Sequence, residues 1–531
     1  MIKDDRAAVG VKNYRSDTRS IDLMKWEWNR ASITLLLFSA ILTACDASDR
    51  QAEDAAIVVD SVSVVERPPN IVFIFADDLG IGDTSVYGSE IINTPNIDKL
   101  AATGVRFTNG YVSHPVCSPS RAGLLTGRYQ QRHGWEFNPA GRDVDSGMSV
   151  SERTFADELK ASGYATGMVG KWHLGYEGLH HPMSRGFDEY FGVLAGGSIF
   201  IDPDTPGVES MGQLSRTRSS RVGIMHGHNP VTVENYLTDV FTDEAVDFID
   251  RHREEPFFLY LSHTTPHTPL QATAKYLNRY RHIEDQSTRI YAAMVASLDD
   301  SVAAVVAKLE EIGQRDNTLI VFASDNGCAS YINGACSNAP FAGFKRYHQE
   351  GGIRVPFILN WPDGLPGGAI YEHPVISLDL LATFSAAAGR PVLTEDSVNL
   401  LPYLRGDRSG TPHEYLYWRS GPTIAIRDAR WKLIRYNKTQ LTAADLSADG
   451  RLEPPEDGWP TGSPHGQLTL LYDLQSDPGE SENLAKEHPG IVVRLAATHA
   501  QWAAGLSDKQ ILPGLRSTLA EIHGESVQLV F

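Results

Sequence analysis

The sequence lacks several features that would each point to a particular class of protein. It has no excess of basic residues: 47 Lys and Arg stand against 66 Asp and Glu, and the net charge of −19 disfavours binding to nucleic acid. It has no internal repeat or low-complexity tract, and its 42% hydrophobic and 21% charged residues exclude a disordered or multi-span membrane protein. Only four of its 531 residues are cysteines, so each can be considered separately.

The N-terminal region resembles the signal of a bacterial lipoprotein. Two basic residues, Lys25 and Arg30, precede an apolar run over residues 33–42 that is too short to cross a bilayer as a mature helix. The run leads into Leu42-Thr43-Ala44-Cys45, which is similar to a lipobox. We therefore predict that residues 24–44 are a cleaved signal peptide and that Cys45 is lipidated.

This interpretation predicts a bacterial, exported protein that is anchored in a membrane by its lipid and faces the periplasm or the cell surface. Residues 45–69 would form a polar tether, and the polar residues 1–23, which precede a better start at Met24, are expected to be untranslated or disordered. A plain secretory signal and a buried helix are the alternatives. Asp46 hints at retention in the inner membrane, but sorting rules differ among bacteria, so the choice of membrane stays open.

Two further cysteines, Cys328 and Cys336, are close together in the sequence. Export would place them in an oxidising compartment, where they could close a small loop as a disulfide. Two free thiols are the alternative.

Strand-like and helix-like segments alternate over most of the chain. Residues 70–76 form an apolar, β-branched and aromatic run that is typical of a strand buried on both faces of a parallel sheet. Thr94-Pro95 and Thr154 carry helix-start signals. Later segments continue the pattern, with strands predicted at 164–169, 256–261 and 318–323 and helical stripes at 237–249 and 294–312. The pattern indicates an α/β fold with a mainly parallel central sheet flanked by helices.

The chain is longer than one hydrophobic core supports, so we expect a large domain and a smaller one. After about residue 405 the pattern changes to short strands joined by turns, at 415–418, 423–426 and 431–436. We predict a main domain over residues 70–409 and a C-terminal α+β subdomain over 410–531 that contains a short antiparallel sheet.

Polar side chains follow four of the predicted strands. Because functional sites in such sheets lie beyond the carboxyl ends of the strands, these side chains are expected to meet at one edge. They comprise acids, an amide, histidines and a lysine: Asp77, Asp78, Lys171, His173, His263, His267, Asp325 and Asn326.

The segment from Cys117 to Arg128, Cys-Ser-Pro-Ser-Arg-Ala-Gly-Leu-Leu-Thr-Gly-Arg, resembles the signature of type I sulfatases. Further blocks similar to those of this family follow in the same order, and a closing pattern lies at residues 471–484. The resemblance implies an alkaline-phosphatase-like fold. The matching blocks are residues 70–80, Gly170-Lys171-Trp172-His173-Leu174-Gly175, Pro266-His267-Thr268-Pro269, Ser324-Asp325-Asn326-Gly327 and 345–356.

The resemblance implies that a maturation enzyme, either a formylglycine-generating enzyme or an anaerobic counterpart, oxidises Cys117 to formylglycine. The hydrated aldehyde has two hydroxyls, of which one attacks sulfur and the other expels sulfate, so covalent catalysis divides one difficult step into two. A serine could accept sulfate but has no second hydroxyl to expel it. A buried structural cysteine is the alternative interpretation.

The resemblance also implies one calcium ion per chain, bound by Asp77, Asp78, Asp325 and Asn326 together with the modified Cys117. These four side chains offer only oxygen ligands, which suits a hard cation and argues against zinc. Asp and Asn at strand ends are otherwise common turn formers and helix caps.

The family's pattern assigns three cations, Arg121, Lys171 and Lys345, to the nucleophile and the sulfate. Lys345 is the weakest match, because the run before it lacks the usual Arg-Gly sequence. His173 is predicted to take the proton that triggers sulfate elimination, and His267 to protonate the departing alcohol. His263 is a minor candidate for substrate binding.

Four other histidines, His133, His180, His181 and His348, are expected in solvated loops, with the substrate pocket as the alternative.

The sequence thus predicts a sulfuric ester hydrolase acting on carbohydrate from a sulfated polysaccharide such as an algal galactan, ulvan, fucan or glycosaminoglycan. Its rivals are a phosphate or phosphonate ester hydrolase of the same superfamily and a catalytically silent lipoprotein that binds sulfated glycan. The sugar, the sulfate position, endo or exo action and the oligomeric state stay open. Residues 137–147, 194–227 and 438–467 are the predicted substrate-contacting loops.

Overall fold

The computed structural model describes residues 67–139, 147–212, 223–332, 334–438, 466–507 and 517–531. The chain divides into two units, Met1–Val64 and Val65–Phe531. The predicted signal peptide, Cys45 and nearly all of the tether lie outside the described residues, as do parts of the three predicted substrate loops.

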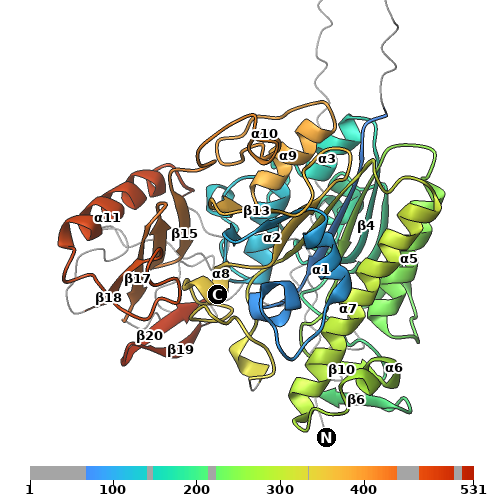
Figure 1. The fold of residues 1–531 in the computed structure, drawn as a ribbon, viewed down its shortest axis with the longest axis horizontal. Coiled ribbons are helices and arrows are strands. Elements are labelled where there is room, and N and C mark those ends of the chain that lie inside the picture. The colour runs from blue at the N-terminus through green and yellow to red at the C-terminus, as the bar shows by residue number, and fades with distance from the viewer. Residues whose placement is uncertain (1–66, 140–146, 213–222, 333, 439–465, 508–516) are drawn as a thin grey trace, which may run out of the picture. The chain divides into compact units, whose positions relative to one another are not determined.

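A ten-stranded sheet forms the centre of the second unit (Figure 1). Its five middle strands, in the order β11-β1-β9-β4-β5, are all parallel. Antiparallel pairs join β12 and β7 to this group. In spatial order the strands are β13 (Ala369–Tyr371), β2 (Val105–Phe107), β12 (Phe357–Asn360), β11 (Thr318–Ser324), β1 (Asn70–Ala76), β9 (Phe257–Ser262), β4 (Ala165–Lys171), β5 (Glu189–Val193), β7 (Ile224–His226) and β8 (Asn229–Val231).

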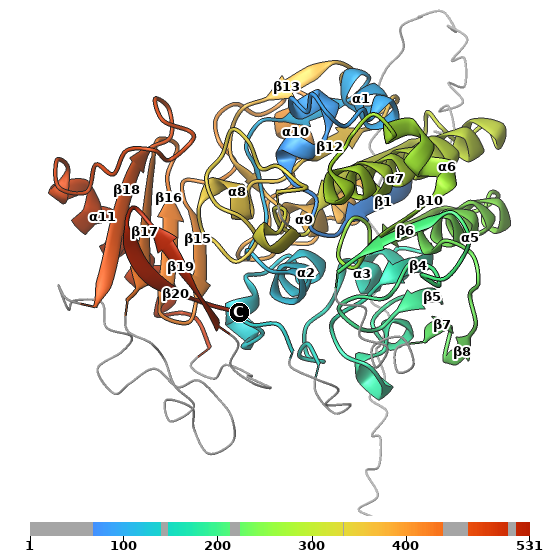
Figure 2. The ribbon, with the colours of Figure 1, turned by 90° about the horizontal axis from the view of Figure 1, so that it is seen from below.

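Helices cover both faces of this sheet (Figure 2). All seven residues of β1 are buried, and its side chains alternate between two hydrophobic clusters, as the period of a strand requires. Phe73 and its neighbours on one face pack with α2 (Cys117–Thr126), α3 (Phe155–Ala161) and α9 (Asp379–Ala387). Ile74 and its neighbours on the other face pack with α1 (Pro95–Ala102), α5 (Leu237–Arg251) and α7 (Gln286–Glu311).

Helix α7 is long and apolar enough to cross a membrane, but 72% of that stretch is buried inside the structure, as in the core helix of a globular domain. Helix α3 begins at the predicted cap: Thr154 Oγ1 accepts a hydrogen bond from Asp157 N (3.1 Å), and Asp157 Oδ2 accepts one from Thr154 N (2.9 Å).

Shorter elements connect these layers. Two small sheets pair β10 (Leu270–Thr273) with β6 (Val208–Met211) and β14 (Val375–Ile376) with β3 (Gly110–Tyr111). Short α-helices are α6 (Ala274–Leu277), α8 (Glu350–Ile353) and α10 (Leu401–Leu404). Turns of 3-10 helix are Ile81–Asp83, Ser85–Tyr87, Gln130–His133, Gly178–His180, Pro182–Ser184, Asn278–Tyr280 and Ser330–Ile332.

A second sheet, built entirely of antiparallel pairs, follows in the C-terminal part. Helix α11 (Pro489–Ala503) packs on it through the buried Leu495, which contacts the cluster of Ile426, Leu433 and Leu471. Both parts of the fold prediction, the mainly parallel α/β sheet and the antiparallel C-terminal sheet, are confirmed. The strands are β15 (Leu416–Ser420), β16 (Thr423–Arg427), β17 (Trp431–Asn437), β18 (Gln467–Asp473), β19 (Ser517–Ile522) and β20 (Glu525–Val530).

A buried charge network joins this second sheet to helix α8. Lys432 of β17 places Nζ 2.8 Å from Glu350 Oε1 and 2.9 Å from Glu480 Oε1, and none of the three side chains is exposed to solvent. Burial disfavours the charged form of Glu350, but Lys432 and Arg354 lower the pKa of this carboxyl to about 2. Lys432 therefore contacts two buried carboxyl groups, and Arg354 is a second cation for Glu350, with Nη1 3.1 Å from Glu350 Oε2.

We expect Lys432→Met to reduce the free energy of unfolding by about 3–5 kcal/mol, because it removes the cation that contacts the buried Glu480 and one of the two that contact Glu350. Urea unfolding followed by fluorescence measures the loss. The matched control is Lys275→Met, which breaks the solvent-exposed contact with Asp239 (3.2 Å) and should cost at most about 1 kcal/mol. Equal losses in the two variants would contradict the compensating role of Lys432.

Candidate active site

The predicted acids meet at the carboxyl ends of β1 and β11. These strands pair in parallel from Asn70 opposite Thr318 to Ala76 opposite Ser324, so the residues that follow them emerge side by side. Asp78 N donates to Asp325 Oδ1 (3.1 Å), and Asn326 Nδ2 donates to Asp78 Oδ1 (2.8 Å). Asp78 has a φ of 65°, a left-handed conformation that is uncommon outside glycine and marks the sharp turn at this strand end.

Cys117 is the first residue of α2 and is 1% exposed. Its Sγ lies 3.0 Å from Lys345 Nζ and donates to Asp78 Oδ1 at 3.7 Å. The amino end of a helix favours negative charge. Burial nevertheless raises the pKa of the Cys117 thiol to about 12, although Lys171 and Lys345 act in the opposite direction.

Each carboxylate of the site has its own nearest buried cation, and Arg121 Nη2 also lies 3.8 Å from Asp77 Oδ1. Lys171 Nζ lies 2.8 and 2.7 Å from the two oxygens of Asp77, and Lys345 Nζ lies 2.6 and 2.7 Å from those of Asp78.

Arg121 binds Asp325 through Nε (2.9 Å) and Nη2 (2.8 Å). Burial opposes ionisation of Asp325, but Arg121 and Lys171 hold the pKa of this carboxyl below its ordinary value. The local basic residues that an anionic substrate requires are therefore present in an otherwise acidic protein.

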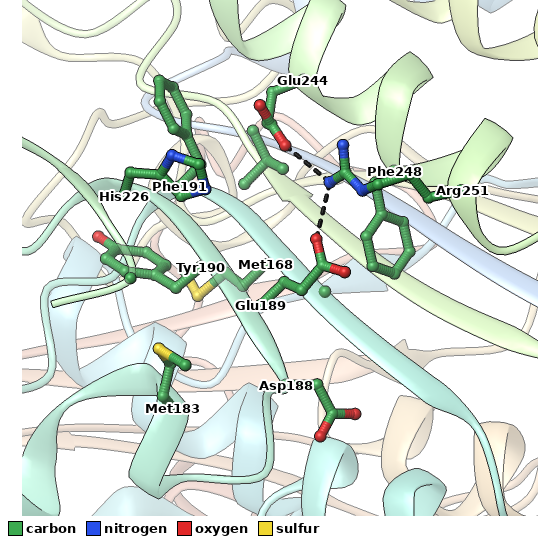
Figure 3. Close-up of a pocket in the computed structure, with 13 residues that line it drawn as sticks. Met168, Met183, Asp188, Glu189, Tyr190, Phe191, His226, Glu244, Phe248 and Arg251 are labelled. Atoms are coloured by element: carbon green, nitrogen blue, oxygen red, sulfur yellow. Dashed lines mark hydrogen bonds and ion pairs between the residues drawn. The ribbon is translucent and has the colours of Figure 1, made fainter. Parts of the chain in front are cut away.

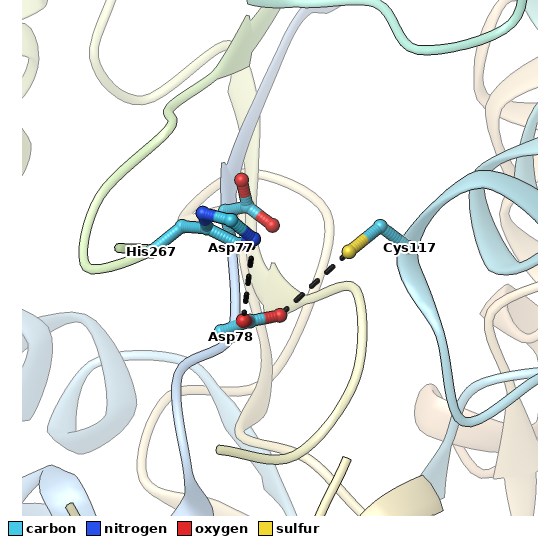
Figure 4. Close-up of side chains that lie close together, drawn as sticks. All are labelled: Asp77, Asp78, Cys117 and His267. Carbon is cyan, nitrogen blue, oxygen red and sulfur yellow. Dashed lines mark hydrogen bonds and ion pairs between the residues drawn. The ribbon is translucent and has the colours of Figure 1, made fainter. Parts of the chain in front are cut away.

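Four ligand atoms gather closely enough to hold a cation: one each from Asp77, Asp78, Cys117 and His267 lie within 4.8 Å of one another (Figure 4). His267 Nδ1 contacts Thr268 O at 2.7 Å, and a carbonyl only accepts, so Nδ1 carries the proton of the neutral ring. Nε2 then presents a lone pair to Asp78 Oδ2 at 3.6 Å. His267 Nε2 and Asp78 Oδ2 are both acceptors, so a cation placed between them can bind both.

Asn326 adds a further indication of a cation site, because its buried Oδ1 has no hydrogen-bond partner. The oxygen-rich donor set of Asp77, Asp78 and Asn326 suits a hard divalent ion. Asp325 lies outside the four-residue group and is joined to it through its contacts with Asp78 N and Arg121. The residues present therefore fit a divalent metal.

The two candidate histidines His173 and His263 have different surroundings. His173 follows β4, is 8% exposed, and keeps Nδ1 without a hydrogen-bond partner. A Cβ on Gly196 would approach His173 Nε2 to 2.5 Å, so glycine is needed beside this ring. His263 is instead fully buried, with Nε2 2.9 Å from Ser301 Oγ on α7, and the structure does not bring it into the four-residue group.

The expectation of solvated loops for the remaining histidines is wrong for His181 and His348, which are 2% and 1% exposed. His348 Nε2 lies 3.3 Å from Ser420 Oγ, and His114 Nε2 lies 2.7 Å from the same oxygen. Packing against the second sheet buries His348. His133 and His180 are half-buried.

Some residues of the site carry no signal in the sequence. Tyr331 donates its hydroxyl to Asp78 Oδ2 (3.2 Å), and Ser262 Oγ accepts from Arg121 Nη1 (2.6 Å). Asn138 Oδ1 accepts from Ser118 N (2.9 Å) beside Cys117. Only the strand-end position of Ser262 could have suggested it.

Cys328 and Cys336 form a disulfide, which settles the choice that the sequence left open.

A cavity of about 210 Å³ lies away from the site, among β4, β5, β7 and α5 (Figure 3). Arg251 bridges Glu189 and Glu244 in it, and its lining contains none of the predicted site residues.

Fold and site together define an α/β enzyme whose strand ends and helix terminus surround a nucleophile position with carboxylates and cations. Such a site can hold a metal ion and a tetrahedral anion at the same time.

Comparison with known proteins identifies the family. A sequence model described as Sulfatase matches residues 69–390. Human N-acetylgalactosamine-6-sulfatase is 36% identical over 444 residues, covering 78% of this chain and 81% of that protein. N-acetylgalactosamine-6-O-sulfatase of Bacteroides thetaiotaomicron is 31% identical over 497 residues, covering 81% and 92%.

Among solved structures, Ps i-CgsB in complex with k-i-k-neocarrahexaose superposes with a TM-score of 0.72 at 32% identity, covering 83% of this chain and 94% of that one. The chain belongs to the sulfatase family and is a sulfuric ester hydrolase.

We expect Arg121→Lys to weaken the binding of a divalent cation such as Ca²⁺ by about 10–100-fold, because a lysine cannot hold Asp325 through two parallel hydrogen bonds. Calorimetric titration of the metal-free protein measures this directly. Arg128→Lys is the matched control from the same motif, since Arg128 pairs with Glu152 and Glu395. Unchanged affinity in Arg121→Lys would show that Asp325 does not depend on this contact.

Proposed function

We propose that this sulfatase removes sulfate from carbohydrates derived from sulfated polysaccharides, using a formylglycine made from Cys117 and one bound calcium ion. The observation that carries the proposal is the position of Cys117 at the start of α2, with Sγ 3.0 Å from Lys345 Nζ and 3.7 Å from Asp78 Oδ1. In the active enzyme, an oxygen of the modified residue stands in place of this sulfur.

The two groups that the protein acquires supply separate chemistry. Formylglycine supplies, as its hydrate, one hydroxyl to attack sulfur and another to expel sulfate. Calcium would be held by Asp77, Asp78, Asp325 and Asn326, and would supply positive charge that favours an ionised nucleophile and attracts the sulfate group. A formylglycine-generating or anaerobic maturation enzyme is therefore a required partner.

The charges of the site support binding of an anion. Asp77, Asp78 and Asp325 balance Lys171, Lys345 and Arg121, so a divalent cation would leave the cluster with excess positive charge. A sulfate ester is negatively charged and neutralises part of that excess. Lys345 Nζ, already in contact with position 117, would stabilise negative charge on the attacking oxygen.

Proton transfer is assigned to two histidines. We infer that His267 acts through Nε2, because Nδ1 is engaged with Thr268 O; once Nε2 has taken up a proton, the ring can pass that proton to the departing alcohol oxygen. His173 Nδ1 has no hydrogen-bond partner and is available to take the proton whose removal triggers release of sulfate. His263 contacts Ser301 and is given no part in the reaction.

The names of the relatives support a saccharide substrate. Two are N-acetylgalactosamine-6-sulfatases, and the solved structure of Ps i-CgsB contains a neocarrahexaose. We therefore propose a sulfated saccharide of the glycosaminoglycan or algal galactan type.

We expect the matured enzyme to release sulfate from N-acetylgalactosamine 6-sulfate or from sulfated neocarrahexaose with a kcat/KM well above that for N-acetylgalactosamine 6-phosphate. Ion chromatography of free sulfate and phosphate measures both reactions. Faster release of phosphate would instead favour the phosphate ester hydrolase.

Two variants of the nucleophile serve as controls for this experiment. Cys117→Ala should lose activity by several orders of magnitude. Cys117→Ser should become sulfated once and then stop, because the serine ester has no second hydroxyl to expel sulfate. Intact-protein mass spectrometry detects the retained sulfate. Full activity in Cys117→Ala would end the proposal for this nucleophile.

We also propose that the protein is an exported lipoprotein that is anchored through Cys45 and faces the periplasm or the cell surface. The expected result for Cys45→Ala is loss of fatty-acid labelling and movement of the protein from the membrane to the soluble fraction. Cys117→Ala, which leaves Cys45 in place, should keep the label. Labelling that persists in Cys45→Ala would rule out this anchor.

A further inference from the structure

Tyr331 borders the reacting position on the loop that the Cys328–Cys336 disulfide closes. Its hydroxyl donates to Asp78 Oδ2 at 3.2 Å, and Asp78 Oδ1 lies 3.7 Å from Cys117 Sγ. The residue is nevertheless 43% exposed, and it is the one aromatic among the exposed large hydrophobic side chains in the part of the chain that the structure describes. Tyr331 therefore extends from the solvent-exposed surface to a carboxylate that contacts the nucleophile position.

The Tyr331 ring is held by its neighbours. The Arg346 guanidinium lies 5.2 Å from the centroid of the Tyr331 ring and 3.8 Å from that of Phe531. Arg346 has a φ of 82°, a strained conformation for arginine, and its backbone N donates to Pro115 O (2.8 Å). The same short segment thus places Lys345 on Asp78 and the next residue against Tyr331.

The loop that carries Tyr331 is fastened at its base. Cys328 N donates to Asn338 Oδ1 (2.9 Å), and Lys345 N donates to Cys328 O (2.9 Å). Cys328 is fully buried and Cys336 is 9% exposed, so the disulfide anchors the loop in the protein core. A side chain that is fixed before binding loses little conformational entropy when a ligand covers it.

We propose that Tyr331 forms the sugar subsite of this enzyme, with the aromatic ring packing against the C–H face of the pyranose that carries the sulfate ester. The subsite rests on the proposed function and adds the residue that recognises the carbohydrate. Arg346 is the positioning residue that orients the ring.

The geometry favours this assignment. A sulfate whose sulfur is attacked from position 117 is joined through one ester oxygen to its sugar, so the sugar lies next to the residues that border the nucleophile. Tyr331 is such a residue, and aromatic side chains provide rigid apolar surface together with a polar end. A pyranose, with an apolar C–H face and hydroxyl edges, is complementary to it.

Hydrolysis of N-acetylgalactosamine 6-sulfate and sulfated neocarrahexaose, each compared with ethyl sulfate, tests the subsite. Ethyl sulfate has the same ester but no ring. Tyr331→Ala should lower the ratio of kcat/KM for saccharide to that for ethyl sulfate about tenfold or more, mainly through KM. Tyr331→Phe, which keeps the ring and removes the hydroxyl, should largely preserve the ratio. Arg346→Met should lower it less than Tyr331→Ala.

Leu393→Ala is the control, since Leu393 is 96% exposed and belongs to no proposed subsite. An unchanged ratio in Tyr331→Ala overturns the subsite. Equal losses in Tyr331→Phe and Tyr331→Ala also overturn it, because they would assign the effect to the hydroxyl on Asp78. A wild type that cleaves ethyl sulfate but neither saccharide overturns the glycan substrate itself, together with the subsite.

Binding to Cys117→Ala protein gives a readout that does not need turnover. Adding Tyr331→Ala should raise the Kd for each saccharide about tenfold relative to the Kd for inorganic sulfate. Saccharide binding that depends on Tyr331, together with a matured wild-type enzyme that releases no sulfate, would support the subsite while contradicting the proposed reaction. Saccharide binding that is independent of Tyr331 would overturn the subsite alone.

Discussion

The one-to-one pairing of three buried carboxylates with three buried cations is the constraint on which the site depends. Asp77, Asp78 and Asp325 lie at strand ends where no solvent can screen them, so each needs its own partner. Removing one member of a buried pair typically costs about 3–5 kcal/mol. The pairs also leave the cluster near neutrality, so the charge of a bound divalent cation would be offset in part by the charge of an anionic ester bound beside it.

Much of this arrangement could be predicted from the sequence, because it follows from the strands. The apolar run at 70–76 is typical of a strand buried on both faces, and the run at 318–323 has the same character, so both are predicted as strands of the mainly parallel sheet. The first acidic residues after these runs, Asp77 and Asp325, are then expected at the same edge of the sheet. The motif around Cys117 supplied the remaining element, since it combines the nucleophile with Arg121 four residues later.

Other features depend on tertiary packing, which leaves no local pattern. His263 and His267 lie four residues apart, yet one contacts Ser301 on α7 and the other faces Asp78. Tyr331 contacts Asp78 across 253 positions of sequence, and Lys432 of the second sheet contacts Glu350 of helix α8. His348 is polar and lies in a connecting segment, which suggested exposure, but the second sheet covers it.

The contact of Ser420 with His114 and His348 has a consequence for engineering. His114 precedes the nucleophile by three residues and His348 follows Lys345 by three, so this hydroxyl at the end of β15 touches both segments that build the reaction centre. The second sheet therefore cannot be replaced without affecting the segments that carry the nucleophile and Lys345. A chimera that took this sheet from another sulfatase would have to bring a matching hydroxyl with it, or alter the geometry around the nucleophile while leaving every reacting residue in place.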